Sequence, residues 1–319
     1  MSFSNDLKNE TSRIHLTSSK LMLAELSGFV RTCGELKNTK DNISLEFVTE
    51  NASIARRIFT FLKSYTSELE AYKKKSNQLN KNSNYLIVMK DKYAIDDLLY
   101  DTDFVINGQY DNKNYVVNEY IVKTDDELRA YLRSCFLGAG SVTNPEKSYH
   151  LEFIGKTKEF AEDIKEKLVK KSLNAKTTMR KSHYIIYLKE AEQISDFMAL
   201  IGANQSLLNL ENIRIVKELR NNVNRVVNCE TANISKIITA SMKQIEDIEF
   251  LIDIGKFSEL SSDIREVGQL RLKNEDSSLQ DISDLTNGKY SRSGINYRLK
   301  KISKMAQKLR GANNERNES

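Results

Sequence analysis

The chain has 319 residues, of which 39% are hydrophobic and 29% are charged, and its formal net charge at pH 7 is +5. No window approaches the roughly 20 consecutive apolar residues of a membrane span, and the polar start does not resemble a secretory signal. The three cysteines are far apart, which favours neither a disulfide framework nor a zinc site. We therefore expect a cytoplasmic protein of two or three domains, with no membrane partner, no bound metal and no cofactor.

Two segments of the first two thirds are alike. Residues 26–34 read LSGFVRTCG, and residues 132–140 read LRSCFLGAG. Each closes an apolar helical pattern with a glycine suited to a helix C-terminus. Small residues in the two segments would let the two helices approach closely: Ser27, Gly28, Ser134 and Ala139.

The elements expected after each segment are also alike. After the first we expect a strand at 43–48, a helix at 52–69 and a strand at 85–89. After the second we expect a strand at 149–154, a helix at 157–171 capped by Thr157, strands at 175–179 and 183–188, and a helix at 191–200. The repeated order predicts an α+β body with pseudo-twofold symmetry.

The charge is unevenly distributed. Residues 91–127 contain ten acidic and three basic residues, and we interpret them as a solvated connector that avoids polyanions. Residues 170–189 contain six basic residues and no acid. The run from Lys73 to Lys75 is a possible DNA contact, although such a run on a polar connector is usually only solvated.

The two glycine-ended segments resemble degenerate copies of the LAGLIDADG helix of homing endonucleases. The resemblance implies that the two motif helices pack together at the interface between the repeats, while a saddle of strands faces DNA. In active members each copy supplies an acid at the penultimate position, because the divalent cations at the scissile phosphates need hard oxygen ligands. Here those positions are Cys33 and Ala139, and the other acidic motif position is Arg31 or Leu137. We expect no cleavage chemistry.

The last third is predicted to be helical. We expect an amphipathic helix at 207–227 that closes the repeat body, helix-capping side chains in NCETAN (228–233), and helices at 234–254 and 262–273. Ser278 would cap a short helix that Asn287 and Gly288 stop. A final helix from about Ser293 has one apolar row: Ile295, Leu299, Ile302, Ala306 and Leu309. The polar segment 313–319 is expected to be disordered.

This end of the chain is predicted to bind DNA. Residues 289–310 contain eight Lys or Arg and no acid, and a phosphate backbone favours such clusters. In a helix-turn-helix, the start of the second helix enters the major groove. The residues expected there are Ser291, Arg292, Ser293, Asn296, Tyr297 and Lys300. We expect phosphate contacts mainly from Arg298, Lys301, Lys304 and Lys308. The seven-residue connection at 286–292 is longer than the usual three or four residues.

A worn two-repeat LAGLIDADG body followed by NCETAN and by SRSGINYRL (291–299) resembles the WhiA family of bacterial sporulation and cell-division transcription regulators. The resemblance implies repeats at 1–120 and 121–227 and a helical DNA-binding domain at 228–312, with the helix-turn-helix at about 278–309. It also implies a nucleoid-associated, sequence-specific regulator of promoters in sporulation and cell division or chromosome segregation.

Two other functions are consistent with the residues. The chain could be an endonuclease that uses other carboxylates, such as Glu35 and Glu152, or a protein-interaction scaffold without DNA contact. The sequence does not decide whether the repeat body grips DNA or binds a protein co-regulator.

Overall fold

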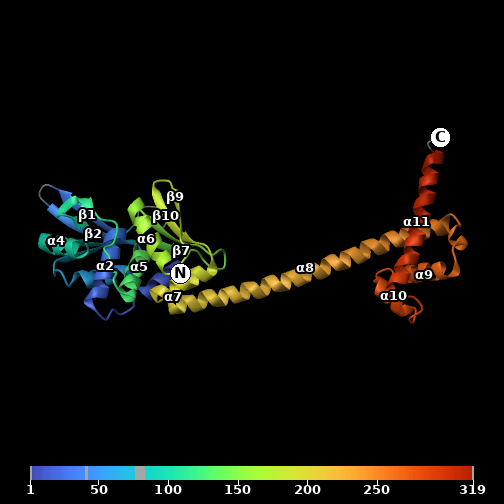
Figure 1. Ribbon diagram of the computed structural model, residues 1–319, viewed down its shortest axis with the longest axis horizontal. Coiled ribbons are helices and arrows are strands. Elements are labelled where there is room, and N and C mark those ends of the chain that lie inside the picture. The colour runs from blue at the N-terminus through green and yellow to red at the C-terminus, as the bar shows by residue number, and fades with distance from the viewer. Residues whose placement is uncertain (1, 40–41, 76–82, 318–319) are drawn as a thin grey trace. The chain divides into compact units, whose positions relative to one another are not determined.

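The computed structural model describes residues 2–39, 42–75 and 83–317 (Figure 1). The chain forms two compact units, one up to Glu218 and one from Leu219 onward. The first unit mixes helices and strands, and the described part of the second is helical. The α+β assignment is confirmed.

The first unit contains one order of elements twice. The first copy comprises α2 (Ser19–Thr32), β1 (Gly34–Thr39), β2 (Asn42–Thr49), α3 (Ala52–Leu62), β3 (Leu69–Lys75), β4 (Ser83–Met89) and α4 (Lys92–Asp101). The second comprises α5 (Asp125–Ala139), β7 (Gly140–Val142), β8 (Leu151–Gly155), α6 (Lys158–Lys170), β9 (Lys176–Arg180), β10 (His183–Leu188) and α7 (Ala191–Ile201). Helix α1 (Phe3–Thr11) precedes both copies, and a hairpin of β5 (Val105–Ile106) and β6 (Gln109–Lys113) lies between them.

Each copy folds into an antiparallel sheet with helices against it. The strand orders are β1-β2-β4-β3 and β7-β8-β10-β9, which correspond strand by strand. Helix α3 packs against β2 and β4, and α6 packs against β8 and β10. Alternate side chains of a strand point to one face, so Leu45 and Phe47 in one sheet and Leu151 and Phe153 in the other are buried. Each repeat thus has a hydrophobic core of its own.

The helices α2 and α5 pack against each other, as the small residues predict. A Cβ added to Gly28 would lie 2.0 Å from Ser134 Oγ, and one added to Gly138 would lie 2.1 Å from Thr32 Oγ1. The close approach therefore depends on these two glycines. We predicted this role for Ala139, but the residue that contacts the facing helix is Gly138.

Helix α3 is shorter than predicted, and the strands that begin each sheet were missed. Helix α3 ends at Leu62, and β3 begins at Leu69 and pairs with β4. The lysine run therefore lies on an edge strand and not on a polar connector. Gly34 and Gly140 end their helices without a left-handed backbone. A Cβ at Gly34 would lie 2.5 Å from the Val30 carbonyl oxygen, so glycine permits an immediate turn into the strand.

The interpretation of residues 91–127 as a solvated connector is wrong. Helix α4 buries Ala94, Ile95, Leu98 and Leu99 in the core of the first repeat. Several acids act locally as helix caps: Asp91 accepts hydrogen bonds from two backbone N–H groups at the start of α4, and Glu127 forms a capping box with Thr124 on α5. The acidic composition reflects helix ends and outer faces rather than an unstructured link.

Helix α8 (Asn204–Asp253) runs through the two predicted helices and the segment between them. The NCETAN segment lies inside this helix and caps nothing, because its residues include neither glycine nor proline to interrupt the backbone. Much of the apolar row that was expected to close the repeat body is exposed: Leu208, Ile215, Val216, Leu219 and Val223. No helix within the described ranges is long and apolar enough to cross a membrane.

The second unit packs the end of α8 with α9 (Ser262–Lys273), α10 (Leu279–Leu285) and α11 (Arg292–Asn317). The predicted apolar row of the last helix is confirmed, since Ile295, Leu299, Ile302 and Ala306 are at most 1% exposed. Ser278 caps α10 as predicted. Helix α11 extends to Asn317, into the segment that we predicted to be disordered.

Candidate nucleic-acid interface

The turn before α11 is held in place by side chains. Six residues separate α10 from α11, and Asn287 and Gly288 adopt left-handed backbone conformations there, with φ of 49° and 82°. The Ser283 hydroxyl donates a hydrogen bond of 2.6 Å to the Tyr290 carbonyl, and the Tyr290 hydroxyl donates one of 3.0 Å to Glu266 on α9. The turn is longer than that of a tight helix-turn-helix, but its two ends are fixed.

The start of α11 is capped and exposed. The Ser291 hydroxyl accepts a hydrogen bond from the Gly294 N–H at 3.2 Å and lies 2.9 Å from the Ser293 hydroxyl. Arg292 and Ser293 are exposed, and Asn296 is partly exposed. This end of the helix therefore presents hydrogen-bonding groups to solvent.

A basic face follows along α11, opposite the buried row. Its side chains recur at steps of three and four residues, so they share one side of the helix. The members of this outer face are Ser293, Asn296, Tyr297, Lys300, Lys301, Lys304 and Lys308. Tyr297 is 58% exposed, and the Lys301 Nζ lies 4.8 Å from the centroid of its ring.

Three basic residues of 289–310 are engaged inside the second unit. Lys289 pairs with Glu266 at 2.6 Å, and Arg310 pairs with Asp247 at 2.6 Å. Arg298 pairs with Asp263 at 3.0 Å and lies 4.1 Å from the Tyr290 ring centroid. By contrast, none of Arg292, Lys300, Lys301, Lys304 and Lys308 forms an ion pair with another residue that the structure describes.

Arg298 therefore does not face outward as expected. It lies three residues after Ile295 and four before Ile302, at the edge of the buried row, and its side chain is only 20% exposed. Its Nη1 also donates a hydrogen bond to the Gly294 carbonyl at 3.1 Å. In the structure this arginine joins α11 to α9.

Arg271 supports the turn that precedes α10 and was missed in the sequence. Its Nη1 donates to the carbonyls of Ser277 at 2.6 Å and Asn274 at 3.3 Å, and to the Ser241 hydroxyl at 3.2 Å. Its side chain is almost fully buried. The sequence does indicate its burial, because Arg271 lies four residues after Val267 on the apolar side of α9. A charged residue at such a position needs buried hydrogen-bond partners.

The two positions that carry acids in active nucleases, Cys33 and Ala139, lie at the C-terminal ends of α2 and α5. A Cβ at Gly138, next to Ala139, would lie 3.5 Å from the Cys33 Sγ. Burial raises the pKa of the Cys33 thiol to about 12, so the group is neutral near pH 7. Neither position offers an anionic oxygen ligand.

The motif position Arg31 has a structural use. Its guanidinium is buried and donates to the carbonyls of Ser27, Thr102, Asp103 and Val116 at 3.0 to 3.2 Å. These bonds tie α2 to the residues that follow α4 and to the segment after β6. An arginine here fixes the chain between the two repeats.

The carboxylates of the alternative nuclease do not form a site. Glu35 is exposed on β1, whereas Glu152 on β8 contacts His150 Nε2 at 3.1 Å and Arg180 at 3.2 Å. Among the described residues no group of three or more His, Cys, Asp or Glu is placed to hold a metal ion.

A buried ionic cluster joins the two repeats. Glu25 on α2 accepts hydrogen bonds from Arg57 on α3 at 2.5 and 2.7 Å and from Arg133 on α5 at 2.8 Å. Glu25 is 0% exposed, and both arginines are nearly buried. Glu25 was not predicted, because the apolar and small residues of α2 give no sign of a buried acid among them.

Three family models match the chain. They are the WhiA N-terminal LAGLIDADG-like domain over residues 19–105, the WhiA LAGLIDADG-like domain over 128–220 and the WhiA C-terminal HTH domain over 223–306.

Curated relatives and a solved structure agree with these matches. The chain is 42% identical to probable cell division protein WhiA of Clostridium botulinum, with 98% of this chain and 100% of the relative covered. It is also 42% identical to the protein of that name from Clostridium beijerinckii, with 97% and 99% covered. The crystal structure of full-length WhiA from Thermatoga maritima matches with a TM-score of 0.59 and 23% identity, over 97% of this chain and 99% of that one. The chain belongs to the WhiA family.

Proposed function

We propose that the chain is a sequence-specific double-stranded DNA-binding transcription regulator of sporulation and of cell division or chromosome segregation, acting at promoters on the nucleoid in the cytoplasm. The observation that carries the proposal is the outer face of α11, where Lys300, Lys301, Lys304 and Lys308 lie beyond a polar helix start and form no ion pair with another described residue. The match to the WhiA HTH domain and the relatives named for cell division support it.

The two ends of the outer face have different roles in this proposal. The first turns of α11 enter the major groove, where Arg292 reads guanine and Asn296 reads adenine through paired hydrogen bonds. Ser291, Ser293 and Tyr297 flank them. Lys300, Lys301 and Lys304 neutralise phosphates and give affinity without sequence choice. Arg298 keeps α11 in position through Asp263 and makes no phosphate contact.

For the repeat unit two roles stay open in the proposal, a second and nonspecific grip on DNA or the binding of a protein co-regulator. A DNA grip would raise avidity through effective concentration, because both units belong to one chain. Sequence choice would still come from α11.

Replacing Arg292, Asn296 and Lys300 together by alanine in the full chain should weaken selective promoter binding about a hundredfold or more. Each lost base contact costs about 1–3 kcal/mol, and each lost phosphate contact lowers the salt slope by about 1. The measurement is a salt series of binding to a promoter fragment and to a scrambled duplex. Point substitutions are preferred to removal of α11, because Ile295, Leu299 and Ile302 complete the core of the second unit.

The control variant replaces Lys243 and Lys273 by alanine, which removes two exposed charges of the same unit and leaves α11 intact. It should bind nearly as the parent chain does, and circular dichroism should show both variants folded. If the triple variant is folded and binds the promoter as the parent does, α11 does not read DNA, and the scaffold function is favoured.

We also propose that the chain lacks nuclease activity. Supercoiled plasmid incubated with the full chain and magnesium should remain uncut, as it does with EDTA, because the motif positions Cys33 and Ala139 supply no hard oxygen ligand. Magnesium-dependent nicking that disappears in Glu35→Gln or Glu152→Gln would instead establish the endonuclease.

A further inference from the structure

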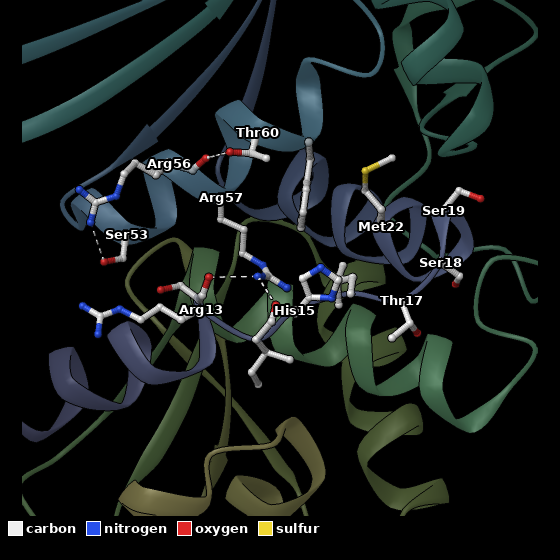
Figure 2. A pocket seen from close by; sticks show the side chains of 14 residues that line it. Arg13, His15, Thr17, Ser18, Ser19, Met22, Ser53, Arg56, Arg57 and Thr60 are labelled. Carbon is white, nitrogen blue, oxygen red and sulfur yellow. Dashed lines mark hydrogen bonds between the residues drawn. The ribbon is translucent and has the colours of Figure 1, made fainter.

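A cleft of about 720 Å³ lies in the first unit, and neither Cys33 nor Ala139 is among the residues that line it (Figure 2). Its walls are the segment between α1 and α2, the first turns of α2, and one side of α3. The second unit contributes no residue to it.

The ionisable side chains that line this cleft are all basic. They are Arg13, His15, Arg56 and Arg57, and none of the described residues lining the cleft is acidic. In Figure 2 the guanidinium groups of Arg13 and Arg56 lie at one side of the view, with His15 and the end of Arg57 nearer the middle. The cleft therefore attracts anions.

Two of the arginines are free to meet a ligand. The Arg13 side chain is exposed and forms no hydrogen bond or ion pair with any other residue in the described part of the chain, while its backbone N–H donates to the Glu10 carbonyl at 3.1 Å. Arg56 is exposed, and its guanidinium donates one hydrogen bond of 3.2 Å, to the Ser53 hydroxyl. A guanidinium without a carboxylate is suited to a bidentate bond with a phosphate.

The third arginine makes the wall rigid. Arg57 is neutralised by Glu25, and its Nη1 donates to the carbonyls of Ser12 at 3.0 Å and Ile14 at 2.7 Å. Those bonds fix the segment that carries Arg13 and His15. The cleft is thus formed before a ligand arrives, which lowers the cost of binding.

The remaining walls suit a phosphorylated molecule with an apolar part. Thr17, Ser18 and Ser19 place hydroxyls at the start of α2, a helix with no acidic residue in its first turn, so its dipole also favours an anion. Met22 and Phe61 line the cleft as well and offer an apolar surface of the kind that ligand pockets use for rings or carbon chains.

We infer that this cleft binds a small phosphorylated metabolite, a diphosphate or phosphate ester on an aromatic or apolar body. Arg13 and Arg56 hold the phosphoryl oxygens, the hydroxyls at the start of α2 complete their hydrogen bonds, and the body of the ligand lies against Met22 and Phe61. The site would make the repeat unit a ligand-binding domain. The inference does not depend on the DNA-binding proposal.

Titration calorimetry of the full chain with ADP and with inorganic pyrophosphate tests the inference. We expect both to bind, ADP more tightly, and Arg13→Gln/Arg56→Gln to weaken ADP binding about tenfold or more. Both substituted side chains are exposed, so the variant should fold, and Arg57 is left unchanged because of its structural bonds. The control Arg129→Gln/Lys158→Gln removes two exposed charges elsewhere in the unit and should bind ADP as the parent does.

Other outcomes would overturn the inference. Equal binding of ADP by the parent and by Arg13→Gln/Arg56→Gln places the nucleotide elsewhere. If pyrophosphate binds as tightly as ADP, the apolar body of the ligand makes no contribution to binding, and the inferred contact with Met22 and Phe61 is wrong. If a 20-bp duplex displaces ADP and the double variant loses DNA binding in parallel, the cleft holds a DNA phosphate rather than a metabolite.

Discussion

Replacing Glu25 by alanine should lower the free energy of unfolding of the first unit by about 3–5 kcal/mol. The substitution leaves Arg57 and Arg133 buried without their carboxylate. An uncompensated buried charge costs more than the pair itself contributes. Because Arg133 also donates to the Ile201 carbonyl at 2.8 Å, the loss should loosen the contact of α5 with α7 as well as with α2.

Hydrogen exchange in mild denaturant, followed on the amides of α2, α5 and α3, gives the local free energy of opening. Glu70→Ala is the matched control, because it breaks a pair with Lys90 in which the side chains are 41% and 60% exposed. That loss should stay within about 1 kcal/mol. If the two substitutions have equal effects, the buried cluster does not hold the repeats together.

Replacing Arg31 by leucine, the residue at the equivalent position 137 of the second repeat, should destabilise the first unit by about 3 kcal/mol. The leucine fills part of the volume but leaves the carbonyl oxygens of Thr102, Asp103 and Val116 without the guanidinium group that donates to them. Arg31→Lys should recover only part of the loss, because an ammonium group has three donors and no planar fork.

The effect should be concentrated between the repeats. Protection of amides 102–104 and 116–118 against exchange should fall more than that of α6, which Arg31 does not contact. Equal loss of protection in α6 would show that Arg31 acts on the whole unit and not as a tie for the connecting segment.

The parts of this structure that follow from local pattern were predicted well. The apolar row on α11, the cap at Ser278 and the repeat of helix, strands and helix need only periodicity and capping chemistry, which the sequence displays directly. The edge strands of the first repeat were missed because β1 (GELKNT) and β3 (LEAYKKK) carry mostly polar or charged residues. Their strand state comes from pairing with β2 and β4, and such pairing is a tertiary effect.

The candidate site was also predicted only where local pattern was sufficient. Position on the helix wheel was enough to place Lys300, Lys301 and Lys304 on an exposed face. Helix position alone did not predict that Arg298 turns inward, because its partner Asp263 lies on another helix and the local sequence does not indicate the ion pair. The cluster around Glu25 was hidden for a similar reason, since its partners lie 32 and 108 residues away in the sequence.

The crossing of α2 and α5 shows that the two halves of the repeat unit are no longer interchangeable. Gly28 and Ser134 occupy equivalent positions of the duplicated motif, as do Thr32 and Gly138. At each of these two contacts a glycine on one helix faces a hydroxyl side chain on the other. Two copies of the first half would set glycine against glycine and threonine against threonine, leaving a gap at one contact and a steric clash at the other. A pair of second halves would fail in the same way. Neither half therefore presents a helix surface that could pack in this way against a second copy of itself.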